Sequence, residues 1–202
     1  MPYSRKTPRR LRRHLVTLAE LDRTNQQVTG EMERLGLWSD ALAEVGVWLV
    51  PVSLDCYGWH SGTPGSISIP AVSFASLGDY LRGDHVRLAD VLRHEWAHAL
   101  ADRMPKLVYN ADFRRVFGGS YASPRPVWEY HPDLHLTRYA ATCPCEDFAE
   151  TFHFYLRHKG RLPLRLSGKR EIVRKWRFVA RMARAMAKAG ASANAKARVR
   201  LR

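Results

Sequence analysis

Residues 88–104 read LADVLRHEWAHALADRM. Its apolar residues recur at helical intervals and Pro105 follows directly, so we expect a helix that ends at Met104. Val91, Leu92 and Leu100 give this helix an apolar side. That side should pack against a hydrophobic core.

His94, Glu95 and His98 form an HExxH sequence in the middle of this helix. Residues four apart share a helix face, so both imidazoles can reach one metal ion. Imidazole is a good zinc ligand, and a catalytic Zn²⁺ keeps one position open for water. Glu95 can then accept a proton from that water as a general base. The alternatives are a chance occurrence of the motif and a buried histidine pair without metal.

A catalytic zinc usually has three protein ligands, so a further one has to come from another segment. Ala101 and Met104 stand where an HExxHxxGxxH motif would supply its Gly and third His. Residues 144–158 are expected to form the next helix. Glu146 and Glu150 share one face of it, so one carboxylate can bind the metal while the other orients an imidazole.

Other side chains that can bind metals lie close to this second helix. Cys143 and Cys145 flank its first residue, and thiolates bind zinc well, but Glu146 fits the helical geometry better. Three histidines are interpreted as surface or loop residues rather than ligands: His131, His135 and His153.

The whole pattern resembles that of the gluzincin metallopeptidases. The HExxH sequence is followed by Tyr139 and by the segment EDFAE at 146–150. This order is similar to that in the catalytic domain of anthrax lethal factor and in zinc-binding peptidases with an EDFAE segment. The resemblance implies that Glu146 is the third zinc ligand, that Glu150 orients a ligand, and that Tyr139 stabilises the tetrahedral intermediate. Asp147 replaces an apolar residue of the lethal factor pattern, which leaves its role open.

The resemblance covers about residues 67–155 and implies a zinc metalloendopeptidase acting on a protein or peptide substrate. A phenol beside zinc can donate a hydrogen bond to a developing oxyanion, which suits Tyr139. The alternative is that Tyr139 is an ordinary core or surface tyrosine.

We expect an α+β fold of the zincin-like type, with a small, mostly antiparallel sheet packed on the HExxH helix. Residues 47–54 are apolar and β-branched, and Ile67 and Ile69 alternate with Ser68, so both stretches predict strands. We expect Ile67–Phe74 to form a sheet edge along which the substrate adds as a further strand.

Two more helices are expected at the ends of the chain, one from Leu11 to Leu35 and a cationic one over 169–189. The chain divides into a basic arm (1–13), a zincin-like catalytic domain (14–160), and a basic C-terminal helix and tail (161–202). The stretch 110–142 is rich in Pro and aromatic residues and is expected to be irregular.

The positive charge is concentrated at the C-terminal end. Residues 159–202 contain 15 lysines and arginines and one acid, Glu171, which accounts for the whole formal net charge of +14. Basic segments such as 1–13 and 161–202 can bind nucleic acid or another polyanion. The alternative is that they serve only as solubilising tails. We expect Ile172–Met186 to dock on the core and 191–202 to be frayed and more available to a partner. The alternative function is therefore a nucleic-acid-binding regulator on a zinc-bound zincin fold with little proteolysis.

Composition narrows the remaining classes of protein. Three cysteines do not form the framework of a disulfide-rich secreted protein. No apolar run approaches the ~20 residues that span a bilayer, and the N-terminus lacks the apolar region of a secretory signal. The Arg-rich N-terminus also suits a mitochondrial transit peptide, but a cytoplasmic location is the simpler interpretation.

Overall fold

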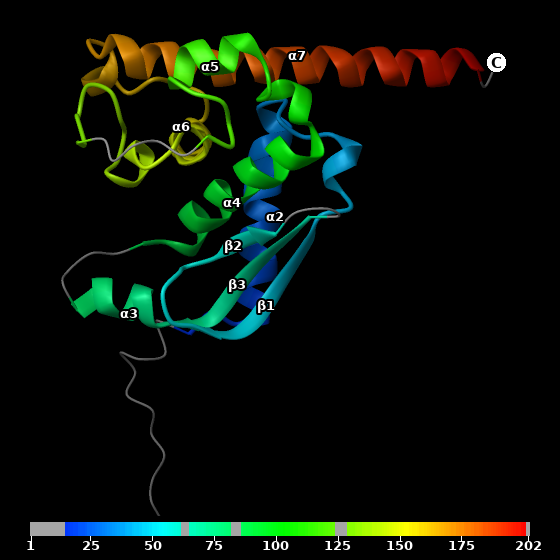
Figure 1. The fold of residues 1–202 in the computed structure, drawn as a ribbon. Helices are drawn as coiled ribbons and strands as arrows, with labels where there is room; N and C mark the ends of the chain where they lie inside the picture. Colours follow the sequence, from blue (N-terminus) through cyan, green and yellow to red (C-terminus); the bar gives the residue numbers. More distant parts are fainter. Residues whose placement is uncertain (1–14, 62–64, 82–85, 124–128, 201–202) are drawn as a thin grey trace, which may run out of the picture.

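The computed structural model describes residues 15–61, 65–81, 86–123 and 129–200 (Figure 1). The predicted basic arm, 1–13, lies outside these residues. Helices and strands follow in the order α2 (Leu18–Arg34), β1 (Gly46–Ser53), β2 (Trp59–Ser61), β3 (Ser66–Ser73), α3 (Phe74–Leu81), α4 (Leu88–Arg103), α5 (Ala111–Phe117), α6 (Pro144–Arg157) and α7 (Arg170–Arg200). Four 3₁₀ turns lie between them: η1 (Asp40–Leu42), η2 (Pro105–Leu107), η3 (Tyr139–Ala141) and η4 (Leu164–Leu166). The fold is therefore α+β, as predicted.

The small sheet is mixed, so the prediction of a mostly antiparallel sheet was wrong. β3 is the central strand. β1 pairs with it in parallel over seven residue pairs, whereas β2 pairs with it in antiparallel fashion over three. The alternation of apolar and polar residues predicts which face of a strand is buried, but it does not fix the direction of the neighbouring strand.

The strand edge that was predicted to bind the substrate is not free, because β3 is the central strand of the sheet. Ile67 pairs with Val47 of β1 on one side and with His60 of β2 on the other, and Ser68 is likewise paired on both sides. Ile67 and Ile69 are fully buried. The assignment of Ile67 and Ser68 to an open edge was therefore wrong, and β2 is the outer strand beside them, while Ile69 pairs with Leu49 of β1.

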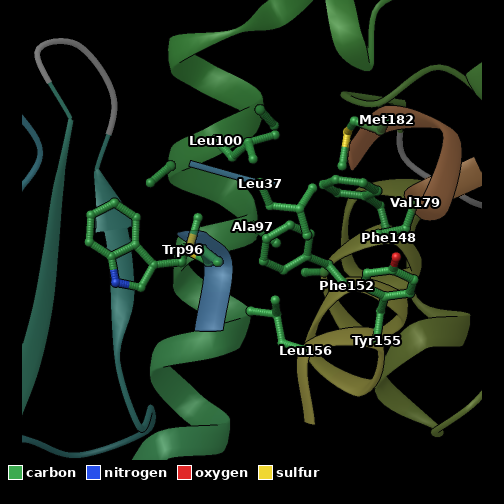
Figure 2. Packing of buried hydrophobic residues seen from close by; sticks show 14 of the residues in the cluster. Leu37, Trp96, Ala97, Leu100, Phe148, Phe152, Tyr155, Leu156, Val179 and Met182 are labelled. Atoms are coloured by element: carbon green, nitrogen blue, oxygen red, sulfur yellow. The ribbon is translucent and has the colours of Figure 1, made fainter. Parts of the chain in front are cut away.

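Helix α4 lies in the centre of the core, with α2 and α6 packed against it. Figure 2 shows Trp96 pointing away from α6, while Phe148 and Phe152 of α6 lie on the side that faces α4. The indole Nε1–H of Trp96 donates to Asn25 Oδ1 of α2 at 2.9 Å. Leu100 is fully buried. Because α4 is covered on several sides, its polar HExxH residues are held in a rigid frame.

Two predicted boundaries change in the structure. The helix was expected from Leu11, and the first part of that stretch, 11–14, lies outside the described residues. Within them the helix begins at Leu18, after the N-cap Thr17, whose side chain accepts a hydrogen bond from Glu20 N–H. The stretch 110–142, expected to be irregular, contains helix α5. Asn110 caps the start of α5, and Gly118 ends it with a φ of 74°. Its two turns are too short to produce a clear apolar period.

The C-terminal helix α7 docks on the rest of the fold, as predicted for Ile172–Met186. Trp176, Val179 and Met186 are buried in the common core. Figure 1 shows α7 as a straight helix that crosses near α5 and α6 and extends well past them. It continues to Arg200, so the segment expected to be frayed from residue 191 is helical as far as that residue. Of the helices in the described ranges, none is long and apolar enough to cross a membrane.

Candidate metal centre

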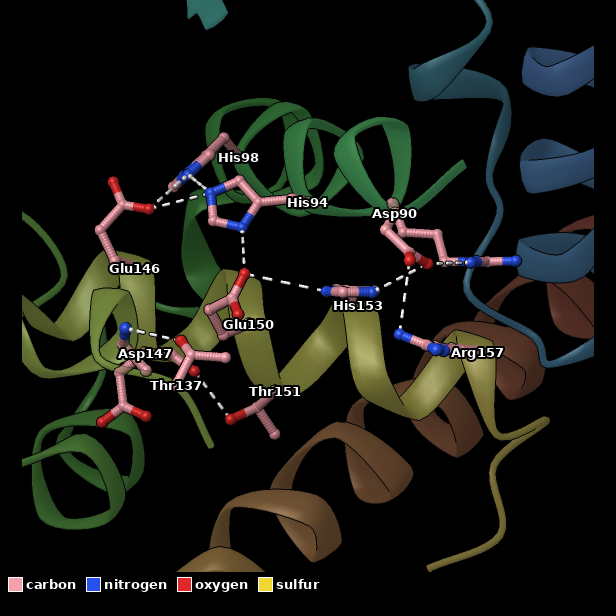
Figure 3. Close-up of polar contacts among 12 residues, drawn as sticks. Asp90, His94, His98, Thr137, Glu146, Asp147, Glu150, Thr151, His153 and Arg157 are labelled. Atoms are coloured by element: carbon pink, nitrogen blue, oxygen red, sulfur yellow. Dashed lines mark hydrogen bonds and ion pairs between the residues drawn. The ribbon is translucent and has the colours of Figure 1, made fainter. Parts of the chain in front are cut away.

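Side chains from α4 and α6 meet at a single point of the structure (Figure 3). His94 Nε2 lies 2.9 Å from Glu146 Oε2, and His98 Nε2 lies 3.4 Å from the same oxygen. The two Nε2 atoms are 3.2 Å apart. The three residues predicted to be metal ligands are thus brought together, although Glu146 is 48 positions beyond His98 in the sequence.

Helix α6 places Glu146 at this point because its first turn is fixed. Cys143 is the N-cap residue, and its Sγ accepts a hydrogen bond from Glu146 N–H at 3.4 Å. Two and six residues beyond Glu146, Phe148 and Phe152 are fully buried. The packing of these rings sets the rotation of α6, which turns Glu146 toward α4.

The carboxylate of Glu150 orients the imidazole of His94. Its Oε1 lies 2.8 Å from His94 Nδ1. A carboxylate can only accept, so Nδ1 carries a proton, and in the neutral imidazole the lone pair is on Nε2, which faces Glu146. Such carboxylate–histidine pairs are typical of the surroundings of protein-bound metals.

Tyr121 contacts the Nδ1 atom of His98, as Glu150 contacts that of His94. Its hydroxyl lies 2.8 Å from His98 Nδ1. When the hydroxyl accepts this hydrogen bond, the Nε2 lone pair of His98 also faces Glu146. Sequence reasoning missed Tyr121, because a tyrosine in an irregular stretch 23 residues after its partner has no recognisable spacing.

The three convergent atoms fit a zinc ion. In this arrangement two imidazole lone pairs and a carboxylate oxygen face one another, and all three atoms lie within 4.8 Å of each other. Glu146 Oε2 is buried and has no hydrogen-bond donor of acceptable geometry among the described residues. Acceptors gathered in this way repel one another unless a cation lies between them. Two nitrogens and one oxygen are a donor set that suits Zn²⁺.

The electrostatics of the site also favour a positive charge at this point. Burial lowers the pKa of His94, but the carboxylates of Glu146 and Glu150, which lie beside its two ring nitrogens, outweigh it and raise that pKa to about 10. Burial raises the pKa of Glu146, but His94 and His98 outweigh it and lower that pKa to about 2. The carboxylates therefore stabilise either a proton on the imidazole or a bound cation.

Glu95 is buried next to the three convergent atoms. Its side chain is 7% exposed, and burial raises the pKa of its carboxyl above the ordinary value. It borders a cleft of about 310 Å³ that also reaches His98, Tyr121 and Glu146. A second cleft of about 280 Å³, lined by apolar residues such as Val91, meets the first at Glu95. The predicted base thus lies where two clefts join.

Tyr139 lies at the mouth of both clefts, in η3. It is 54% exposed, and its ring centroid lies 5.6 Å from that of His94. Burial, together with the nearby carboxylates of Glu146 and Glu95, raises the pKa of its phenol. Tyr139 is therefore a protonated hydrogen-bond donor at neutral pH, beside the site.

His60 of β2 is a further cleft residue that sequence reasoning missed. Its Nδ1 lies 3.3 Å from Asp102 Oδ2, and its Nε2 is buried without a hydrogen-bond partner among the described residues. Burial lowers the pKa of His60. A backbone hydrogen bond from His60 also reaches Glu95. A single histidine in a turn-rich stretch carried no signal of this role.

His153 is buried, so its assignment to the surface was wrong. It lies behind Glu150, with Nδ1 3.8 Å from Glu150 Oε1 and Nε2 3.1 Å from Asp90 Oδ1 (Figure 3). Asp90 in turn forms ion pairs with Arg93 and Arg157. The carboxylate that orients His94 is therefore part of a buried chain of alternating charges.

His135 lies in a loop, as predicted, but is buried, whereas His131 is exposed. His135 Nδ1 lies 3.4 Å from Asp147 Oδ2, and the same oxygen lies 2.7 Å from Nζ of the buried Lys175. Asp147 thus ties α6 to α7, on a different face of α6 from Glu146.

The alternative thiol ligands lie close to the site as well. Cys143, Cys145 and Glu146 also have ligand atoms within 4.8 Å of one another. Cys145 borders the cleft. Burial, followed by Cys143 and Glu146, raises the pKa of its thiol to about 12. Only a bound metal would convert that thiol to a thiolate at neutral pH.

The chain matches no family model, no curated protein and no solved structure. The resemblance to gluzincins consequently stays a prediction. The chemistry of this centre is inferred from its own residues and their geometry.

Proposed function

We propose that this protein is a zinc-dependent metallopeptidase that hydrolyses peptide bonds. The observation that carries the proposal is the convergence of His94 Nε2, His98 Nε2 and Glu146 Oε2 beside a buried acid, Glu95, in an open cleft. Three protein ligands and a nearby carboxylate are the requirements of a hydrolytic zinc site.

A bound Zn²⁺ would polarise the scissile carbonyl and lower the pKa of water in the cleft. Glu95 accepts the proton of the attacking water and returns it to the leaving amine. Its raised pKa suits both steps, because a base with a pKa closer to neutrality is also a competent acid. Tyr139 donates a hydrogen bond to the oxygen that gains negative charge.

The clefts indicate how a polypeptide is held. β2 is the outer strand, and Trp59 and His60 of this strand line the larger cleft. An extended substrate adds to β2 through backbone hydrogen bonds, in place of the edge of β3 predicted from the sequence. The second cleft continues on the other side of Glu95. Substrate residues can therefore extend on both sides of the scissile bond, as an endopeptidase requires.

The test combines zinc content with cleavage of a mixed peptide library, analysed by mass spectrometry. Wild-type protein should contain about one zinc per chain and cleave peptides internally. Glu95→Gln keeps the size of the side chain but cannot accept a proton, so it should keep the zinc and lose at least ~10²-fold in activity.

His94→Ala should lose most of the zinc as well as the activity, while His131→Ala, at an exposed histidine outside both clefts, provides a matched control. If zinc content follows Cys145→Ser instead of Glu146→Ala, the ligand assignment is wrong. Full activity in Glu95→Gln would reject the mechanism.

A further inference from the structure

The outer face of α7 carries evenly spaced cationic side chains. Steps of four and three residues alternate between them, so they form one straight stripe along the helix. All six are exposed: Arg170, Arg174, Arg177, Arg181, Arg184 and Lys188. We refer to these six residues as the basic stripe. At 1.5 Å per residue it is about 27 Å long.

Most of this charge is not neutralised within the protein. Arg174 pairs with Glu171, and Arg181 pairs with Asp112. The other four members have no acidic partner among the described residues. Glu171 is also the only acid in residues 159–202. The stripe is therefore a linear array of charges available to an external polyanion.

The way α7 is docked argues against a membrane as the partner. A helix that binds a lipid surface inserts its apolar face between the headgroups. In α7 that face is already occupied, because Trp176, Val179 and Met186 are buried in the protein core. The Nζ of Lys175, on the flank of the helix, is fixed against Asp147.

A protein partner also fits poorly. Stable protein interfaces are centred on aromatic or large aliphatic anchors. Among the described residues of α7, no large hydrophobic side chain is exposed. The same observation argues against single-stranded nucleic acid, whose bases stack on exposed aromatic rings.

We propose that the basic stripe binds the phosphate backbone of duplex nucleic acid. The phosphates of a duplex are a regular linear array of negative charge, and neutralising them releases counterions. Contacts of this type carry no sequence information, so binding should be independent of sequence. With up to six phosphate contacts, log K should fall with log[salt] with a slope of up to about −5.

The test uses full-length protein and a short fluorescent DNA duplex, with anisotropy titrations at several salt concentrations. The stripe variant combines Arg177→Gln, Arg184→Gln and Lys188→Gln. The matched control removes the same charge from exposed residues elsewhere, as Arg23→Gln, Arg87→Gln and Lys106→Gln. The stripe variant should lose about 2.7 units of slope, and the control should keep the wild-type slope.

Equal slopes for the two variants would overturn the proposal, because only net charge would then matter. It would also be overturned if wild type failed to bind duplex at low salt, or if stripe-dependent binding occurred only to anionic vesicles. Glu95→Gln should bind duplex like wild type, so the outcome is independent of whether the protein is a peptidase.

Discussion

Glu150→Gln is the most informative single change at the proposed zinc site. Glu150 touches no metal ligand atom, yet its Oε1 lies 2.8 Å from His94 Nδ1. Despite burial, the neighbouring imidazoles of His153 and His94 hold the pKa of its carboxyl well below the usual value. At neutral pH the side chain is therefore an anion that fixes the tautomer of His94.

Glutamine has nearly the same shape but lacks the charge, and it can present an NH₂ group in place of the oxygen. It then leaves His94 Nδ1 with a weaker partner, and part of the population adopts the tautomer whose Nε2 carries a proton. Loss of such a supporting group typically costs 10–100-fold in metal affinity, or about 1.4–2.8 kcal/mol. Glu150 is also 9% exposed, so solvent does little to replace the lost interaction.

The assay is competition for zinc against a chromophoric chelator at fixed pH, with circular dichroism to verify the fold. Glu33→Gln, an exposed glutamate of α2, controls for the loss of one negative charge. Zinc should bind Glu150→Gln 10–100-fold more weakly than Glu33→Gln. Dissociation constants that agree within about twofold would refute the assigned role of Glu150.

Two further predictions concern stability. Lys175→Met removes the ammonium group that lies 2.7 Å from Asp147, a residue only 1% exposed. It should lower the free energy of unfolding, measured in urea, by about 3–5 kcal/mol. Lys188→Met, on the exposed face of α7, should change that free energy by less than about 0.5 kcal/mol. A loss below about 1 kcal/mol would mean that this pair is not fixed as described. Although burial acts to raise it, hydrogen bonds with Arg93 and Gln27 lower the pKa of Glu31 below 4.5. The associated stabilisation is present above about pH 4.5 and is lost as pH falls through the lower folded-state pKa. In Glu31→Gln the free energy of unfolding should therefore fall less steeply with decreasing pH than in wild type. The same dependence on pH in Glu31→Gln and wild type would contradict the assigned role of Glu31.

The central helices could be predicted because their signals are local. The bounds of α4 and α6 agree with the sequence prediction to within one residue. Both helices have an apolar period, a proline at one end, and polar residues at steps of four. The same spacing placed His94 and His98 on one face, and it grouped Glu146 with Glu150.

The residues that surround the ligands could not be predicted, because their contacts depend on how separate elements pack. Tyr121 and His60 reach the site from an irregular stretch and from a three-residue strand. His153 was assigned to the surface because histidine is often exposed, but the chain places it between two carboxylates. The direction of β1 relative to β3 is likewise a property of the whole chain.

The EDFAE segment illustrates how one short helix serves both the proposed chemistry and the fold. Three acids within five residues would repel one another on an isolated helix. In α6 they point to different partners: Glu146 to the convergent histidines, Glu150 to the back of His94, and Asp147 to Lys175 of α7. Asp147 and Glu150 each have a positive or proton-donating neighbour, which offsets the cost of burial. A cation at the histidines would complete this compensation for Glu146, and it would also link α4 to α6. Metal binding and the docking of these two helices should therefore be coupled.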